Sequence, residues 1–243
     1  MTEPDPSTEP LVSFLREDRI VLSEAESKAL LGRFDIPVVA ERVVDSGEGA
    51  LEAAAAIGYP VVVKGDAPGL RHKSDHGLVH LDIDSPDALT RAVSTVQASL
   101  DEHVPSHDQH VLVQPMLAGA EIMLGMQYDE QFGPMVAVGP GGIFVELLDD
   151  VVLRRPPIDR AMADAMVRET RAIDLLQGAR STSRYDIEAL LELVERFGEF
   201  CRDTDPLLAT VDLNPVVVRA SGAGAVAVDA MIELRRGTEV EDS

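Results

Sequence analysis

Residues 211–230 read VDLNPVVVRASGAGAVAVDA, and this stretch carries the strongest structural signal of the 243-residue chain. Two Val-rich segments, 211–218 and 225–232, flank the small residues Ala220–Gly224. Apolar, β-branched segments on either side of a glycine-containing turn predict an antiparallel β-hairpin. We therefore expect two adjacent strands here, in a register that the turn sets.

Three oxygen-bearing side chains converge on one face of this hairpin. Asp212 and Asn214 are two residues apart on a strand and share a face, and pairing about the turn sets Asn214 opposite Asp229. Carboxylate and amide oxygens suit Mg²⁺, a hard cation that also binds phosphates. The alternative is a pair of solvent-facing carboxylates, and a one-residue slip would turn Asp229 away. Because Asp212 and Asp229 sit in Val- and Leu-rich strands, we favour a magnesium site.

The rest of the chain first alternates helices with strands and then becomes strand-rich. Hydrophobic periodicity and capping residues predict helices at 23–34, 48–57, 85–100, 159–176 and 186–203. Strands are expected at 59–64, 78–83, 110–116, 121–128, 133–138, 143–148 and 151–154. Ser23 and Glu26 have capping-box spacing at the start of the first helix. This order predicts an α+β fold in two lobes, with a largely antiparallel sheet flanked by helices.

Composition narrows the class of protein. The sequence is 45% hydrophobic and 26% charged, with a formal net charge of −22. An acidic chain without a Lys/Arg cluster is poorly suited to nucleic acid or to an anionic membrane, and no apolar run is long enough to span a bilayer. Only three basic residues are lysines, Lys28, Lys64 and Lys73. The single cysteine, Cys201, excludes an intrachain disulfide and fits a buried helix face. We expect a cytoplasmic protein.

Polar and cationic groups gather between Lys64 and Gly77. Lys64 ends an apolar strand, so its ammonium should reach a carboxylate or a ligand anion, although a lysine extending to solvent there is equally common. The loop 65–77 contains RHKSDHG at 71–77. Cationic donors and backbone N–H groups suit a phosphoryl group, and histidine accepts phosphate reversibly. Taken alone, however, this loop is more often a solvated polar segment.

Two carboxylates and a glycine cluster give weaker signals. Glu121 and Glu146 lie inside apolar strands, where each needs a cation, a ribose hydroxyl or an arginine. The segment Gly139-Pro-Gly-Gly142 either brings backbone close to a ligand or simply turns a hairpin.

The ordered motifs together resemble the ATP-grasp β subunit of ADP-forming acetyl-CoA synthetase, an acid–CoA ligase. Between Leu22 and Leu234 they are LSEAESKALLGRFDIPV, GYPVVVK, RHKSDHG, VLVQPMLAGAEIMLG, DEQFGPMVAVGPGGIFVELLDDVVLR, LLQGAR and VDLNPVVV…AVDA. The resemblance implies an ATP-grasp fold, in which two α+β lobes hold the nucleotide between them.

Domain boundaries follow from the motifs. We expect an N-terminal lobe at 22–109 with a phosphate loop at 65–77, and a C-terminal lobe at 110–235 with the hinge and the magnesium site. The acidic, Pro-rich segment 1–21 is expected to be a flexible tail, and 236–243 a second tail.

On the nucleotide side, the resemblance implies roles for residues that match the family's motifs. Lys64 matches the lysine that binds ATP phosphates, and Glu121 a carboxylate beside the nucleotide. Asp212, Asn214 and Asp229 fall at the Mg²⁺ ligands, in agreement with the hairpin register. The hinge that lines the adenine pocket is matched by Gln114, Pro115 and Met116.

On the phosphate side, the resemblance implies that Arg154 and Glu146 lie near the transferred group. His72 matches the histidine of the family's HK(S/T)D loop. In these enzymes phosphate moves between ATP and a phosphohistidine of the α subunit, and this histidine carries it on the way. Lys64, His72 and Arg154 are therefore the expected catalytic residues.

Four positions depart from the family's usual pattern. Gly65 stands where an apolar residue is usual, Leu78 replaces a glycine, Pro140 interrupts a glycine loop and Ser181 replaces a glycine. Leu78 and Ser181 are expected to stiffen loops near the phosphates. None of the four removes a charged group that the chemistry needs.

The function implied is interconversion of acyl-CoA, ADP and phosphate with acid, CoA and ATP, with ATP/ADP and Mg²⁺ as cofactors. Because no GxGxxG unit for CoA binding occurs, a separate CoA-binding α subunit is expected, in an α₂β₂ assembly by analogy. Two alternatives stay open: a non-catalytic nucleotide-sensing module, and another ATP-grasp ligase that forms an acyl phosphate. The sequence leaves the acid, the direction and the choice of adenine over guanine undetermined.

Overall fold

The computed structural model describes residues 8–17, 19–70, 73, 76–105, 108–142, 150–177 and 185–236. Internal contacts divide the chain into two compact units. The smaller unit comprises Leu22–Glu26 and Val39–Leu117. The larger unit comprises the described residues of Met1–Val21, Ser27–Val38 and Ala118–Ser243.

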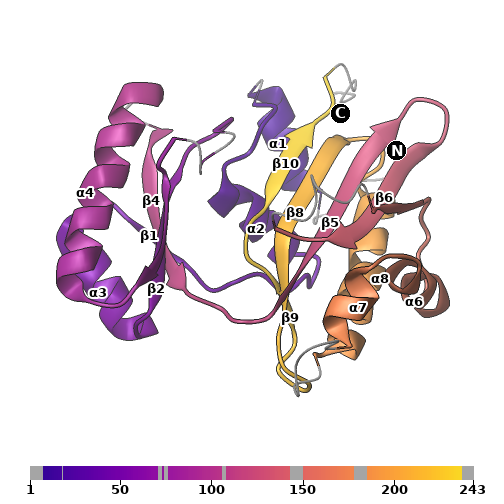
Figure 1. Ribbon diagram of the computed structural model, residues 1–243. Helices are drawn as coiled ribbons and strands as arrows, with labels where there is room; N and C mark the ends of the chain where they lie inside the picture. The colour runs from indigo at the N-terminus through magenta and orange to yellow at the C-terminus, as the bar shows by residue number, and fades with distance from the viewer. Residues whose placement is uncertain are drawn as a thin grey trace. The chain divides into compact units, whose positions relative to one another are not determined.

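The smaller unit is a four-stranded antiparallel sheet with two helices on one face (Figure 1). The strand order is β1-β4-β2-β3. Its elements are β1 (Arg42–Val44), α3 (Gly47–Ile57), β2 (Val61–Asp66), β3 (Val79–Ile83), α4 (Pro86–His103) and β4 (His110–Pro115). Alternate side chains of β2 and β4 pack with α3 and α4 into the hydrophobic core, which leaves the other face of the sheet for polar residues.

The larger unit is a six-stranded antiparallel sheet with α6, α7 and α8 on one face (Figure 1). The order is β10-β8-β5-β6-β7, and β9 also pairs with β8. The strands are β5 (Ala120–Asp129), β6 (Gly133–Pro140), β7 (Val152–Arg154), β8 (Leu208–Val218), β9 (Ala225–Ala227) and β10 (Met231–Leu234). The helices are α1 (Glu9–Arg16), α6 (Arg160–Glu169), α7 (Ala172–Leu176) and α8 (Ile187–Asp203). Helix α2 (Glu24–Gly32) begins in the smaller unit and continues into the larger one.

The predicted hairpin register is present, in two separate ladders. Val216 pairs with Ala227, and Asp212 pairs with Met231. Both pairings belong to the register that sets Asn214 opposite Asp229, so the register prediction is confirmed. The single strand expected at 225–232 is wrong, because it is interrupted between β9 and β10.

The predicted boundaries of the lobes need correction. β4 pairs with β2 and β1, so it belongs to the smaller unit, and the chain leaves that unit after Leu117 rather than after residue 109. Residues 27–38 belong to the larger unit, where the Ala227 N–H donates to the Pro37 carbonyl. The segment 1–21, expected to be a flexible tail, contains helix α1 with Leu11 fully buried.

The helix expected over 159–176 is two helices. Thr170 is extended (φ −102°, ψ 160°) and separates α6 from α7. The Arg171 N–H donates to the Asp150 carboxylate at 2.6 Å instead of continuing the helical ladder. A tertiary contact thus overrides a continuous helical pattern. The strand expected at 143–148 lies outside the described residues.

No helix in the described part of the chain is both long and apolar enough to cross a membrane.

Candidate functional site

The polar face of the smaller sheet carries the predicted lysine. In the β2–β4 ladder, Lys64 pairs with Leu112 and Val62 with Gln114, so Lys64 and Gln114 project from the same face. Asp66, two residues after Lys64, shares this face. Lys64, Asp66 and Gln114 are all buried. Two neighbouring strands thus bring the predicted residues Lys64 and Gln114 to one surface.

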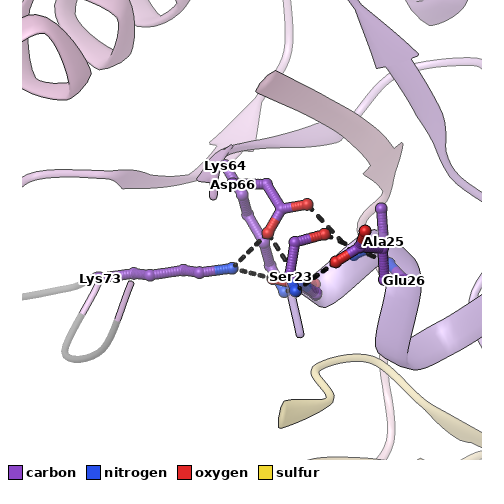
Figure 2. A network of polar contacts seen from close by, with 7 residues as sticks. Ser23, Ala25, Glu26, Lys64, Asp66 and Lys73 are labelled. Carbon is purple, nitrogen blue, oxygen red and sulfur yellow. Dashed lines mark hydrogen bonds and ion pairs between the residues drawn. The ribbon is translucent and has the colours of Figure 1, made fainter. Parts of the chain in front are cut away.

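A buried carboxylate binds Lys64. The Lys64 Nζ donates to Glu24 Oε1 at 2.7 Å, and the exposed fractions of the two side chains are 5% and 1% (Figure 2). Such a buried ammonium needs an anionic partner, since transfer from water costs far more than a hydrogen bond returns. The sequence prediction left a carboxylate or a ligand anion open, and the structure supplies the carboxylate from the first turn of α2.

Asp66 holds that turn of α2 in place. Its Oδ1 and Oδ2 accept the backbone N–H groups of Glu24 and Ala25 at 2.7 and 3.1 Å (Figure 2). The first N–H groups of a helix have no intrahelical acceptor, so a carboxylate there also meets the positive end of the helix dipole. The predicted capping box is confirmed on the same turn, because Ser23 N–H donates to Glu26 and Glu26 N–H to Ser23 Oγ.

Lys73 joins the network from the predicted phosphate loop. Its Nζ donates to Glu24 Oε2 at 2.6 Å and lies 3.4 Å from Asp66 Oδ1 (Figure 2). The loop returns to the sheet through the Leu78 N–H, which donates to the Lys73 carbonyl. The expected catalytic His72 lies outside the described residues.

The predicted hinge lies where the chain leaves the smaller unit. Pro115 pairs with Val61 at the end of β4, and the Met116 N–H donates to the Pro60 carbonyl at 3.1 Å. The division between the units falls between Leu117 and Ala118. The position of this segment agrees with a hinge, and its contact with adenine stays a prediction.

In the larger unit, the predicted metal ligand Asp212 lies on the sheet face opposite the helices. Asp212 pairs with Gly125, whose neighbours Leu124 and Met126 are buried on the other face. Asp229 lies between β9 and β10, at the position that the hairpin register sets opposite Asn214. Asn214 is not paired with either neighbouring strand. The β8–β5 register shifts at this position, and the β8–β9 pairs begin at Val216.

The two aspartates are close enough to affect each other. Partial burial of the Asp212 carboxyl raises its pKa, and the negative charge of Asp229 raises it further, to about 6. Two carboxylates and an amide oxygen are the hard donors that Mg²⁺ prefers, and a divalent cation would relieve this repulsion. The residues therefore fit Mg²⁺. Among the described residues, no group of three His, Cys, Asp or Glu side chains with metal-binding geometry occurs, so the amide of Asn214 is needed to complete the set.

The glycine segment after β6 packs onto this face. The Gly142 N–H donates to Asn214 Oδ1 at 3.1 Å, and the Gly141 N–H donates to the Glu121 carbonyl at 2.9 Å. A Cβ at Gly141 would lie 2.7 Å from the Glu121 backbone, and one at Gly142 would strike the Glu121 carboxylate. The cluster thus serves a close backbone approach that orients Asn214. Gly139 and Pro140, expected in a turn, extend β6 instead.

Arg154 lies against the helices in contact with a carboxylate of α6, and its catalytic role stays a prediction. Arg154 pairs with Val136, which pairs with Met126 and shares the helix-covered face. Its Nη2 donates to both oxygens of Glu169 on α6, at 2.6 and 2.7 Å. The motif match did not reveal this, because edge strand β7 has only three residues and its register is not readable from the sequence.

Three other predicted positions have simple outcomes. Glu146 and Ser181 lie outside the described residues. Cys201 is a free, buried thiol, as expected, and burial raises its pKa well above its usual value.

Sequence reasoning missed Glu24, Asp66 and Lys73. Glu24 lies within a capping motif and Asp66 within a segment expected to be a loop, so neither was considered as a site residue. Lys73 is next to His72, to which the role was assigned. The signal available was charge: Lys64 and Lys73 needed buried counter-ions, and a helix N-terminus needed an acceptor.

The buried Lys64 lies on the sheet of the smaller unit, and the hairpin with Asp212, Asn214 and Asp229 lies in the larger unit. The sequence pattern of the ATP-grasp domain family matches residues 13–234, and the chain belongs to that family.

Within the family, the comparisons point to one kind of enzyme. The β subunit of ADP-forming acetate–CoA ligase II from Pyrococcus furiosus is 37% identical over 223 residues, covering 91% of this chain and 94% of that subunit. A solved acetyl-coenzyme A synthetase 1 from Candidatus Korarchaeum cryptofilum, in complex with coenzyme A and Ca-AMPCP, superposes with a TM-score of 0.86 at 35% identity, covering 94% of this chain and 100% of that one. A structure of the same synthetase with Mg-AMPPCP has a TM-score of 0.79 at 34% identity, again covering 94% and 100%. The chain is thus similar to β subunits of ADP-forming acetyl-CoA synthetases.

Proposed function

We propose that this chain is the nucleotide-binding β subunit of an ADP-forming acyl-CoA synthetase, which interconverts acyl-CoA, ADP and phosphate with acid, CoA and ATP. The observation that carries the proposal is Lys64: a buried ammonium, oriented by Glu24, on the sheet face that also presents Gln114. The relatives that match over nearly their whole length are ligases of this type, which favours the enzyme over a non-catalytic sensor.

The nucleotide phosphates are the groups that these residues suit. A Lys64 ammonium fixed by a buried ion pair offers preorganised positive charge to a phosphate without reorganising during the reaction. Asp212, Asn214 and Asp229 would hold Mg²⁺, with Asn214 oriented by the Gly142 N–H. When bound, Mg²⁺ neutralises charge on the phosphate oxygens. Gln114, Pro115 and Met116 are proposed to line the adenine, and Glu121 to lie beside the nucleotide.

The phosphoryl group is proposed to travel through histidine. His72 is the candidate carrier, with the Lys73 ammonium next to it in sequence, and Glu146 is retained as a candidate on the phosphate side. Arg154 is omitted from the proposal because it faces Glu169.

A CoA-binding α subunit is the proposed partner. The matching subunits of Pyrococcus furiosus are β subunits, which implies an α chain, and we propose an α₂β₂ assembly. We propose a cytoplasmic enzyme, since ATP, ADP and CoA are its substrates.

The test is ATP formation by the reconstituted enzyme. The chain is co-expressed with a CoA-binding α subunit, and ATP is measured from acetyl-CoA, ADP and phosphate with Mg²⁺. The expected result is CoA-linked ATP synthesis, with a base-stable, acid-labile phosphoryl adduct on this chain that is lost in His72→Ala. The control is Asp186→Ala, which removes a cap of α8 that accepts from Ala189 and Gly224 N–H groups.

Two results would overturn the proposal. Nucleotide binding without phosphoryl transfer would make the chain a sensor. Acyl-phosphate formation from a free acid without CoA, detected as a hydroxamate, would make it a different ATP-grasp ligase.

A further inference from the structure

Two lysine ammonium groups share one carboxylate in the smaller unit. Glu24 Oε1 lies 2.7 Å from Lys64 Nζ, and Glu24 Oε2 lies 2.6 Å from Lys73 Nζ (Figure 2). The exposed fraction is 1% for the Glu24 side chain and 12% for that of Lys73. Because each oxygen of a planar carboxylate holds one ammonium group, the position of Glu24 fixes both cations relative to each other.

The charge of Asp66 is largely directed elsewhere. Its two oxygens accept the N–H groups of Glu24 and Ala25, and its distance to Lys73 Nζ is the longer 3.4 Å. A helix N-terminus carries roughly half a positive charge, which offsets much of this carboxylate. Glu24 is therefore a counter-ion that the two ammonium groups share.

Two ammonium groups held by one carboxylate also repel each other. At an effective dielectric constant near 20, two unit charges about 4 Å apart interact by about 4 kcal/mol, so an intervening carboxylate is needed to hold them together. Only three of the 21 lysine and arginine residues are lysines, and two of these three are Lys64 and Lys73. A compact ammonium can approach a phosphate oxygen as a point charge, while a guanidinium is larger and planar.

We propose that Glu24 is a positioning residue that joins Lys64 and Lys73 into one phosphate-binding pair, and that Lys73 supplies a second ammonium group to the transferred phosphoryl group. This inference rests on the proposed function. It adds to that function a second cation from the His72 loop and the carboxylate that places it.

A double-mutant cycle tests the pair in the reconstituted enzyme. Glu24→Gln is expected to lower kcat for ATP formation about a hundredfold, as misplacement of a catalytic group does. The KM for ADP should change less than about threefold, because the loss is in the transition state. Lys73→Met should lower kcat at least about tenfold, and the double variant should be no more than about threefold worse than Glu24→Gln, since both changes disable one unit.

Spectroscopy of the full chain gives a readout independent of turnover. With ¹⁵N-labelled lysine the chain has three side-chain ammonium signals to assign. Inorganic phosphate should shift the signals of both Lys64 and Lys73 in the wild type. In Glu24→Gln both signals should broaden as their protons exchange faster with water, while Asp186→Ala, which weakens the cap of α8, should leave both unchanged.

Several results would overturn the inference. They are additive losses in the cycle, a change in KM alone, a phosphate shift confined to Lys64, or an intact Lys73 signal in Glu24→Gln. If Glu24→Gln does not fold, Lys73→Met and the phosphate titration still test the inference. Lys73 lies on a loop, so its substitution should not prevent folding. A wild-type complex that makes no ATP would contradict the proposed function, whereas the lysine signals report on the pair separately.

Discussion

Leu78 fills the space that a side chain at position 65 would occupy. A Cβ at Gly65 would lie 2.8 Å from Leu78 Cδ2 and 3.1 Å from Leu100 Cδ2, and the Gly65 N–H donates to the Leu78 carbonyl at 2.8 Å. Leu78 is fully buried in the core of the smaller unit. The two positions, both expected to depart from the family's pattern, therefore share one volume in the core. This explains why neither disturbs the polar face that carries Lys64.

The shared volume predicts strong coupling between the two positions. Leu78→Ala should destabilise the chain by about 2–5 kcal/mol by leaving a cavity. Gly65→Val alone should cost about 1–3 kcal/mol by overpacking. The double variant should recover at least about 1 kcal/mol relative to the sum of the two, because the new valine fills the cavity. Urea unfolding of the four chains measures this coupling, and additive losses would contradict it.

The raised pKa of Asp212 predicts how the metal-free chain responds to pH. Folding raises this pKa from 3.8 to about 6, so between these values the folded chain holds a proton that the unfolded chain has released. The contribution of Asp212 to stability therefore falls as pH rises through this window and is level above it. In EDTA, the Tm of Asp212→Asn relative to wild type should rise across the window. A constant difference from pH 4 to pH 8 would contradict the assignment.

Bound Mg²⁺ should offset the loss of stability caused by ionised Asp212. At pH 8 the ionised Asp212 and Asp229 repel, and a cation bound only by the folded chain raises its stability by mass action. The Tm of the wild type should rise with added Mg²⁺, and Asp229→Asn should abolish the rise. Asp84→Asn removes a carboxylate from an exposed position of the smaller unit and should keep the response. An equal response in Asp229→Asn and wild type would refute the site.

Arg154 should behave as a structural residue. An exposed ion pair such as Arg154–Glu169 stabilises a protein by about 0.2–1 kcal/mol. Arg154→Met should lower the free energy of unfolding by about that amount, Glu169→Gln should match it, and kcat should change less than about threefold in both. Chemical denaturation and the ATP-formation assay provide the measurements. A large fall in kcat for Arg154→Met, with Glu169→Gln normal, would return Arg154 to the catalytic residues.

Local patterns in the sequence predicted what local physics determines. The hairpin register followed from strand alternation and a small-residue turn, and the ladders of β8 with β9 and β10 confirm it. The capping box of Ser23 and Glu26 is likewise a short-range interaction. In each case the residues that decide the structure are close in sequence or related by one turn.

Contacts between distant segments were beyond such patterns. Glu24 meets Lys64 across 40 residues of chain, and Asp66 meets the Glu24 N–H across 42. Arg171 ends its helix because Asp150 accepts its N–H, a partner that periodicity cannot supply. Arg154 was assigned by motif alone, although the register of an edge strand decides which way it faces. Long-range polar partners and edge-strand registers therefore could not be predicted from the sequence.

The placement of the lysines has a chemical consequence for a protein proposed to work beside activated acyl groups. Thioesters acylate accessible amines without any catalyst, and an ε-amine reacts only when it is exposed and uncharged. Here Lys28 and Lys64 are 3% and 4% exposed, and Lys73 is bound to Glu24. Every lysine side chain of the protein is thereby shielded, so its surface offers almost no target for self-modification by the metabolites it would handle.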